Sequence, residues 1–132
     1  MAISLQHGGP MDDKRKNRRI NIERRIGIAV HRRFGFAPRR PQMEGTARSV
    51  SMGGMEILTA SPLPVGAVLS LWLRLDENNE SSMVKLRGDV VWSKAGETGV
   101  PSRAGIHLSD RPGGEMESWT NFIAGHLRRC DF

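Results

Sequence analysis

The chain has 132 residues, of which 38% are hydrophobic, and this is enough for one modest core but not for several. The net charge of +6 is uneven, because residues 1–48 hold 12 Lys and Arg against 4 Asp and Glu, whereas residues 49–132 hold 8 against 10. The basic first third therefore points to an anionic partner: a nucleotide, a nucleic acid, a membrane surface or an acidic protein.

The chain begins with a polar stretch and a basic arm. Residues 1–13 mix glycine, proline and polar residues without a period, and we expect them to be disordered. The run over 14–19 is too charged to pack against a core, and it leads into a predicted strand over 20–30. One face of that strand is apolar and carries Ile20, Ile22, Ile26, Ile28 and Val30. The arginine-rich stretch over 32–45 predicts a long basic loop.

Five shorter strands are expected over 46–51, 55–60, 68–75, 84–93 and around 104–108. The first two join at Met52-Gly53-Gly54, where the glycine pair permits a tight or left-handed turn. In the strand over 68–75 a common face carries Leu69, Leu71, Leu73 and Leu75. In the strand over 84–93 one side carries Val84, Leu86, Val90 and Trp92.

Only the end of the chain changes period. From Glu115 onward the apolar residues recur at helical spacing, at Met116, Trp119, Phe122, Ile123 and Leu127. Acidic residues stand in the first turn and basic residues in the last, as the helix dipole prefers. Short strands followed by one amphipathic helix favour an all-β fold, a small barrel with the helix packed on its side or mouth, and a single domain over 14–130.

The sequence favours a soluble, cytoplasmic protein without membrane insertion. No apolar run has the length of a signal peptide or a membrane span. The single Cys130 cannot form an internal disulfide, so the fold does not need an oxidising compartment.

No residue pattern points to catalysis. The four histidines show no metal-ligand spacing, and neither a nucleophile elbow nor a phosphate-binding glycine loop is present. We therefore expect no catalytic residue, no metal and no cofactor, and an enzyme is the least favoured class.

Two features suit a ligand. Arg15 and Arg19 are four residues apart, so in an extended segment they share a face about 13 Å apart and can grip one elongated anion. Ser49 and Ser51 alternate onto one side of their strand, and Gly54 lets the backbone approach a ligand or turn sharply. Taken singly, the first feature also fits a solvated basic leader and the second an ordinary polar hairpin.

Together, and in this order, the two features resemble the PilZ family of cyclic di-GMP receptors. Its pattern is Arg-x-x-x-Arg leading into the first strand, then Asp/Asn-x-Ser-x-x-Gly. Arg15 and Arg19 match the first part, and Ser51 and Gly54 match the second. The resemblance extends over residues 14–128 and includes the late strands and the closing helix.

The resemblance implies a six-stranded antiparallel barrel whose N-terminal arm, residues 14–19, closes over cyclic di-GMP and passes a change of shape to a partner protein. Arg15 and Arg19 would hold a phosphate and stack on or hydrogen-bond the guanines, with added charge from Lys14. Ser51 would offer its hydroxyl, and Gly54 would leave room beside the base.

Ser49 departs from the family pattern, which has Asp or Asn at this position. A carboxylate accepts hydrogen bonds from guanine N1–H and N2–H together, and a hydroxyl accepts only part of that pattern. The lost contact costs on the order of 1–3 kcal/mol. The arginines of the following loop, Arg32, Arg33, Arg39 and Arg40, could compensate through phosphate contacts or serve another partner.

Two other binding functions stay open. Ser49 is compatible with a degenerate PilZ-like domain that has lost the nucleotide and binds another protein constitutively. Nucleic-acid binding through the basic first third is weaker, because its arginines are interleaved only with Phe34 and Phe36 and no specific nucleic-acid motif is present.

Overall fold

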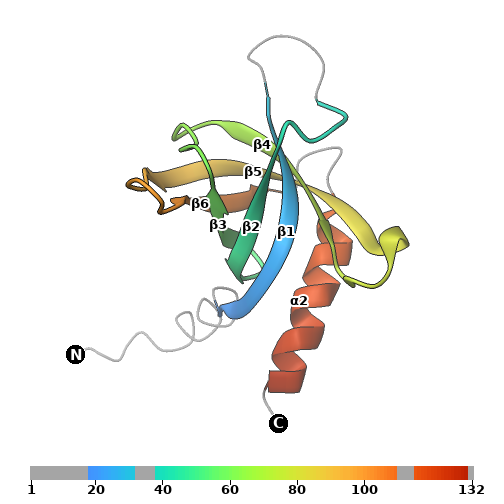
Figure 1. Ribbon diagram of the computed structural model, residues 1–132. Helices are drawn as coiled ribbons and strands as arrows, with labels where there is room; N and C mark the ends of the chain where they lie inside the picture. The colour runs from blue at the N-terminus through green and yellow to red at the C-terminus, as the bar shows by residue number, and fades with distance from the viewer. Residues whose placement is uncertain (1–17, 32–37, 110–114, 131–132) are drawn as a thin grey trace, which may run out of the picture.

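Six antiparallel strands close into a barrel in the order β1-β2-β3-β6-β5-β4 in the computed structural model (Figure 1). They are β1 (Ile20–Val30), β2 (Met43–Val50), β3 (Gly54–Thr59), β4 (Val68–Arg74), β5 (Met83–Lys94) and β6 (Ser102–Ser109). A short 3-10 turn, η1 (Glu80–Ser82), precedes β5, and one helix, α2 (Met116–Cys130), follows β6. The predicted fold class, an all-β barrel with one C-terminal helix, is confirmed.

The structure describes residues 18–31, 38–109 and 115–130. The tail over 1–13 that was predicted to be disordered lies outside these ranges, as do Lys14 and Arg15 of the arm. The same holds for Arg32 and Arg33 of the basic loop.

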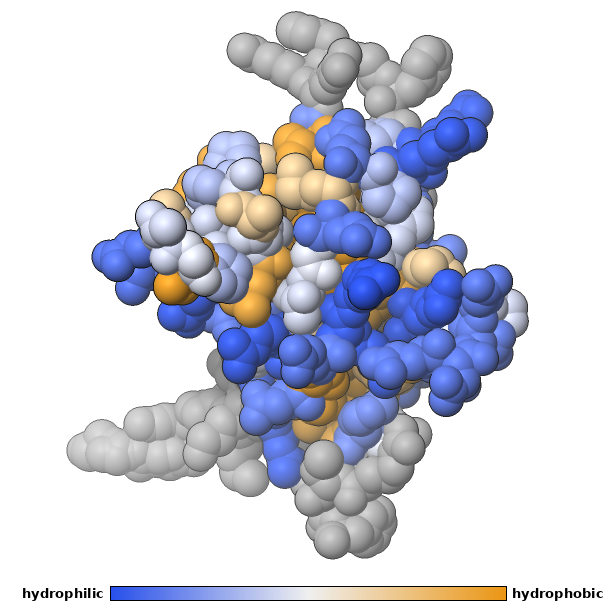
Figure 2. All heavy atoms as spheres, in the orientation of Figure 1, coloured by the Kyte–Doolittle hydropathy of each residue, from blue (hydrophilic) through white to orange (hydrophobic). Residues whose placement is uncertain are grey.

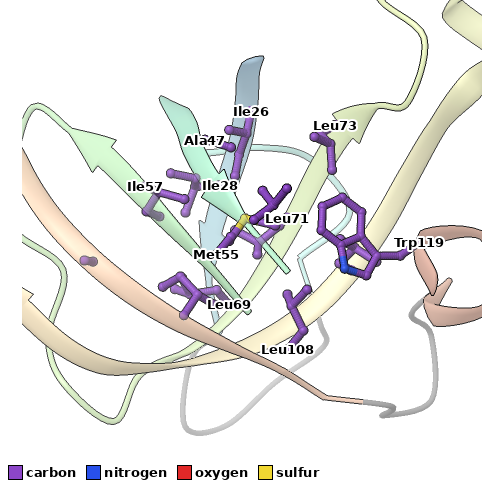
Figure 3. Close-up of a cluster of buried hydrophobic side chains, with 14 of the residues drawn as sticks. Ile26, Ile28, Ala47, Met55, Ile57, Leu69, Leu71, Leu73, Leu108 and Trp119 are labelled. Atoms are coloured by element: carbon purple, nitrogen blue, oxygen red, sulfur yellow. The ribbon is translucent and has the colours of Figure 1, made fainter. Parts of the chain in front are cut away.

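The core fills the inside of the barrel with aliphatic side chains from every strand. Alternation places the predicted leucines of β4 inside, since Leu69, Leu71 and Leu73 are all buried. Ile26 and Ile28 of the neighbouring strand β1 are buried in the same cluster (Figure 3), and Ile28 is the ladder partner of Leu71. With few aromatic residues in the chain, branched side chains provide most of this packing.

Helix α2 closes one end of the barrel (Figure 1). Its apolar stripe of Trp119, Ile123 and Leu127 is buried and belongs to the same core cluster as the strands. The Trp119 side chain is 0% exposed, and its indole points into the barrel end beside Leu73 and Leu108 (Figure 3). The Nε1–H of this indole donates to the backbone carbonyl of Ser51 at 3.1 Å.

Two sequence-based expectations about the strands are wrong. β2 begins at Met43, inside the stretch predicted to be a loop, because pairing with β1 extends the ladder to Ile28↔Met43 despite poor local strand propensity. Trp92 does not continue the buried face of Val84 and Leu86, since its side chain is 40% exposed. A register shift follows Val90, which is still buried, and it turns the strand so that Trp92 leaves that face.

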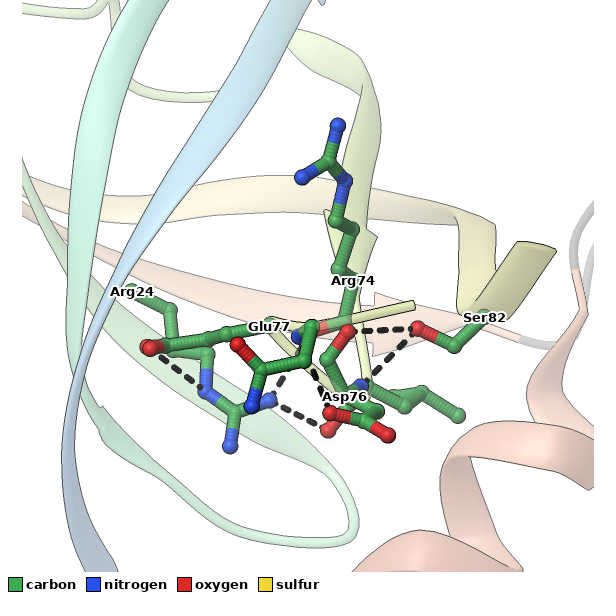
Figure 4. Close-up of polar contacts among 7 residues, drawn as sticks. Arg24, Arg74, Asp76, Glu77 and Ser82 are labelled. Carbon is green, nitrogen blue, oxygen red and sulfur yellow. Dashed lines mark hydrogen bonds and ion pairs between the residues drawn. The ribbon is translucent and has the colours of Figure 1, made fainter. Parts of the chain in front are cut away.

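Arg24 joins three elements at the helix end of the barrel, although it lies on the face of β1 that was predicted to be apolar. Its Nη1 donates to the carbonyl of Arg74 at 2.9 Å and to that of Leu75, and its Nε lies 3.4 Å from Glu77 Oε1 (Figure 4). Its guanidinium carbon lies 5.5 Å from the ring centroid of Phe122 on α2. The Arg24 guanidinium thus donates to the two carbonyls at the end of β4 and contacts α2 through the Phe122 ring.

Hydrophilic side chains cover much of the face seen in Figure 2, including the connection between β4 and β5. Over the described ranges, no helix has both the length and the apolar character needed to cross a bilayer.

The contacts of Arg24 predict a stability effect. Arg24→Met keeps the length of the side chain but leaves two carbonyls without their donor, and we expect it to lower the free energy of unfolding by about 1–3 kcal/mol. Arg25→Met on the exposed neighbouring position is the matched control and is expected to change it by less than about 0.5 kcal/mol. Urea denaturation measures both, and equal losses in the two variants would contradict this role for Arg24.

Candidate ligand-binding site

The turn between β2 and β3 is fixed from several directions. Ser51 N–H donates to the Gly54 carbonyl at 2.8 Å, and Leu108 N–H of β6 donates to the Gly53 carbonyl at 2.9 Å. The Ser51 carbonyl accepts the hydrogen bond from Trp119. Neither Gly53 nor Gly54 has a positive φ, so the left-handed turn that the glycine pair allowed is not formed.

A bulge in β2 sets the direction of the side chains that precede this turn. Ala47 pairs with Ile57 and Ser49 pairs with Glu56, so Arg48 is the extra residue. Val50 returns to the core, while Ser49 lies half-exposed on the outside of the barrel. Bulges redirect side chains in this way next to binding sites.

Ser49 lines a hollow of about 500 Å³ on the outer wall of the barrel. Three strands contribute to it, and its lining residues are Asn21, Ile22, Glu23, Arg48, Ser49 and Glu56. We call this hollow the outer groove. Its ionisable side chains are two carboxylates and one guanidinium, so it holds no surplus of positive charge of its own.

The end of the basic arm reaches the outer groove. Arg19 Nη1 lies 3.4 Å from Ser49 Oγ, which is a long hydrogen bond between the two halves of the predicted site. Both side chains are accessible, so the guanidinium is free to approach an anion lying in the groove.

Ser51 and Gly54 have roles within the fold. The Ser51 side chain is buried, and its hydroxyl donates to the Gly54 carbonyl at 3.4 Å. A Cβ on Gly54 would lie 2.7 Å from the Ile106 carbonyl oxygen, so a glycine is needed there for β3 and β6 to approach. The expectation that Ser49 and Ser51 lie on one side of their strand is therefore wrong, because Ser49 faces the groove and Ser51 is buried in the turn after β2.

Arg39 and Arg40 lie at the opposite end of β1 and β2 from the outer groove. The ladder between these strands runs from Ile28↔Met43 at the loop end to Ile20↔Val50 at the groove end. Seven residue steps of strand separate Met43 from Val50, which is roughly 23 Å. Among the described residues, Arg39 and Arg40 are thus too distant to replace the contact that Ser49 lacks.

Sequence reasoning missed an outer strip beside the groove, formed by Glu56, Trp92 and Arg103. Arg103 Nη2 lies 2.6 Å from Glu56 Oε2, and its guanidinium carbon lies 5.7 Å from the centroid of the Trp92 ring. A Cβ on Gly105 would lie 1.9 Å from Trp92 Nε1, so the indole occupies the space above this glycine. Alternation between buried Met55 and Ile57 was the available signal that Glu56 faces outward.

The sequence over residues 13–125 matches the PilZ domain family. The chain belongs to this family. The family assignment suggested by the two motifs is therefore confirmed, and it accounts for the closed barrel and the closing helix. PilZ domains are receptor or adaptor domains, generally for cyclic di-GMP, and the family includes members that do not bind it.

Two solved structures share the fold. One is the inhibitor of motility MotI/DgrA of Bacillus subtilis, with 17% identity and a TM-score of 0.59 over 85% of this chain and 49% of that one. The PilZ chain thus spans about half of that protein's length. The other is a pathogenic protein of Xanthomonas campestris, described as a tetrameric PilZ domain self-assembled via a helical bundle, with 13% identity and a TM-score of 0.62 over 96% and 98% of the two chains. No curated protein matches the sequence.

The close approach at Gly54 predicts that this motif glycine is needed for stability before any ligand is considered. Gly54→Ala places a Cβ against the backbone of β6, and we expect it to lower the free energy of unfolding by about 1–3 kcal/mol. Gly53→Ala is the matched control, since a Cβ there meets nothing within 4 Å. Thermal unfolding followed by circular dichroism measures both variants, and a Gly54→Ala protein as stable as the Gly53→Ala protein would refute the assignment.

Proposed function

We propose that this PilZ domain is a receptor for cyclic di-GMP that binds the nucleotide in the outer groove. The contact between Arg19 and Ser49 carries the proposal, because it joins the two halves of the family motif at one hollow. Arginine suits this ligand, since its planar fork makes bidentate hydrogen bonds to phosphate and stacks on a base.

The charge of the groove explains why the arm is needed. Cyclic di-GMP carries two phosphates, whereas the groove itself offers Arg48 against Glu23 and Glu56. Lys14, Arg15 and Arg19 would supply the missing positive charge. Ordering the arm costs conformational entropy, and a ligand with several charges offsets that cost, so binding and closure of the arm would occur together.

The turn after Ser49 offers a path to a partner protein. Ser51 follows the groove residue by two positions, and its carbonyl accepts from Trp119 of α2. A ligand that moves the end of β2 would therefore change how α2 packs against the barrel. This route would pass the binding event to a surface that a downstream protein contacts.

Calorimetry at physiological salt tests the receptor function, with GTP and cyclic di-AMP as control ligands. We expect micromolar or tighter binding of cyclic di-GMP that Arg15→Ala/Arg19→Ala abolishes. Arg39→Ala/Arg40→Ala removes the same charge at the far end of the barrel and is expected to retain binding. Equal weakening by both double variants would indicate nonspecific attraction instead of a site.

A second function, constitutive protein binding by a domain that has lost the nucleotide, is favoured by one observation: Ser49 lacks the carboxylate of the family pattern. The absence of cyclic di-GMP binding up to about 1 mM, which corresponds to roughly −4 kcal/mol, would select this function. Partner binding would then survive the replacement of Arg15 and Arg19.

A further inference from the structure

The position opposite Ser49 carries the carboxylate that Ser49 lacks. Ser49 of β2 and Glu56 of β3 are direct partners in the antiparallel ladder, so their side chains project from the same face of the sheet. Both residues line the outer groove. Cβ atoms of such partners lie about 5 Å apart, so the Glu56 side chain starts directly beside Ser49 on the same face.

Within the described part of the chain, one side chain holds the Glu56 carboxylate in place. Arg103 donates to it through Nη2 at 2.6 Å and Nε at 3.1 Å, and both contacts are made to Oε2. A carboxylate has about four acceptor positions on its two oxygens, so the two positions on Oε1 remain for a second donor pair. The Glu56 side chain is 22% exposed, which leaves it accessible from the groove.

The outer strip keeps Arg103 in this position. Its guanidinium stacks on Trp92, and the indole of Trp92 fits over Gly105. Gly105 is itself the ladder partner of Glu56 on β6. Backbone pairing, aromatic stacking and the ion pair together orient the carboxylate before any ligand arrives, and such preorganisation favours affinity.

From this geometry we infer that Glu56 is the guanine-recognising carboxylate of this site and that it accepts hydrogen bonds from N1–H and N2–H of one base. The inference rests on the proposed receptor function and adds a specificity residue to it. The two acceptor positions that remain on Oε1 can take the two adjacent donors on the edge of guanine.

The same pair explains why position 49 carries a serine. An aspartate there would stand directly opposite Glu56, and like charges at directly opposed positions destabilise an antiparallel pair. This part of the outer groove therefore accommodates one carboxylate. In this chain it comes from Glu56 of β3 instead of position 49 of β2. Ser49 contributes a small polar neighbour that leaves room for the base.

Calorimetry with cyclic di-GMP compares Glu56→Gln with the matched control Glu23→Gln. Each variant removes one negative charge from the same groove, and the loss of that charge by itself strengthens the binding of an anion. We expect Glu56→Gln nevertheless to weaken binding about ten- to hundredfold, because its amide N–H₂ faces the donors of guanine. Glu23→Gln is expected to bind as well as the wild type or better.

A second ligand and two variants that carry Ser49→Asp extend the test. The wild type is expected to bind cyclic di-IMP, whose bases lack the N2 amino group, at least about tenfold more weakly than cyclic di-GMP, and Glu56→Gln is expected to lose this preference. Ser49→Asp combined with Glu56→Gln moves the carboxylate back to β2 and is expected to recover most of the lost affinity. Ser49→Asp alone creates the opposed pair and is expected to gain none.

The outcomes separate the two claims. A wild type that binds cyclic di-GMP while Glu56→Gln binds equally well, or that shows no preference over cyclic di-IMP, overturns the role of Glu56 and leaves the receptor function standing. A wild type that fails to bind cyclic di-GMP overturns both. Thermal unfolding of Glu56→Gln within a few degrees of the wild type verifies that the fold is intact.

Discussion

The hydrogen bond from Trp119 to the Ser51 carbonyl is the contact on which the geometry of the candidate site depends. The indole is buried at the end of the barrel, so this bond ties α2 to the turn that ends β2. A buried donor without a hydrogen-bond partner is costly. A packed helix therefore keeps the Ser51 carbonyl, and with it the turn, in place. Ser49 and the outer groove take their positions from this turn and from the bulge at Arg48.

The two serines of the motif illustrate how fold and recognition are divided over a few residues. Ser51 and Gly54 hold the turn and allow β3 to approach β6, whereas Ser49 faces the groove. Under the proposed function, side chains on the outer wall and the basic arm would contact the ligand. A domain of this kind can retain its fold while its recognition residues change, which is consistent with a family that includes nonbinding members.

The sequence predicted the barrel because alternation is strong in β1 and β4, and it predicted α2 because Trp119, Ile123 and Leu127 keep helical spacing. Features that depend on pairing were not predictable from local patterns. The start of β2 at Met43 and the outward turn of Trp92 follow from the register with neighbouring strands. Glu56 escaped notice for the same reason, since only the ladder places it opposite Ser49.

The central claim is that the outer groove is the nucleotide site, and backbone amide chemical shifts of the full chain during a cyclic di-GMP titration test it most directly. The account predicts that the largest changes fall on Ser49, Glu56 and Gly105, with smaller changes reaching Trp119 through the turn. Gly27 and Trp72, which line a separate hollow on the barrel, are expected to stay unchanged. Changes centred on Gly27 and Trp72, or none at saturating ligand, would contradict it.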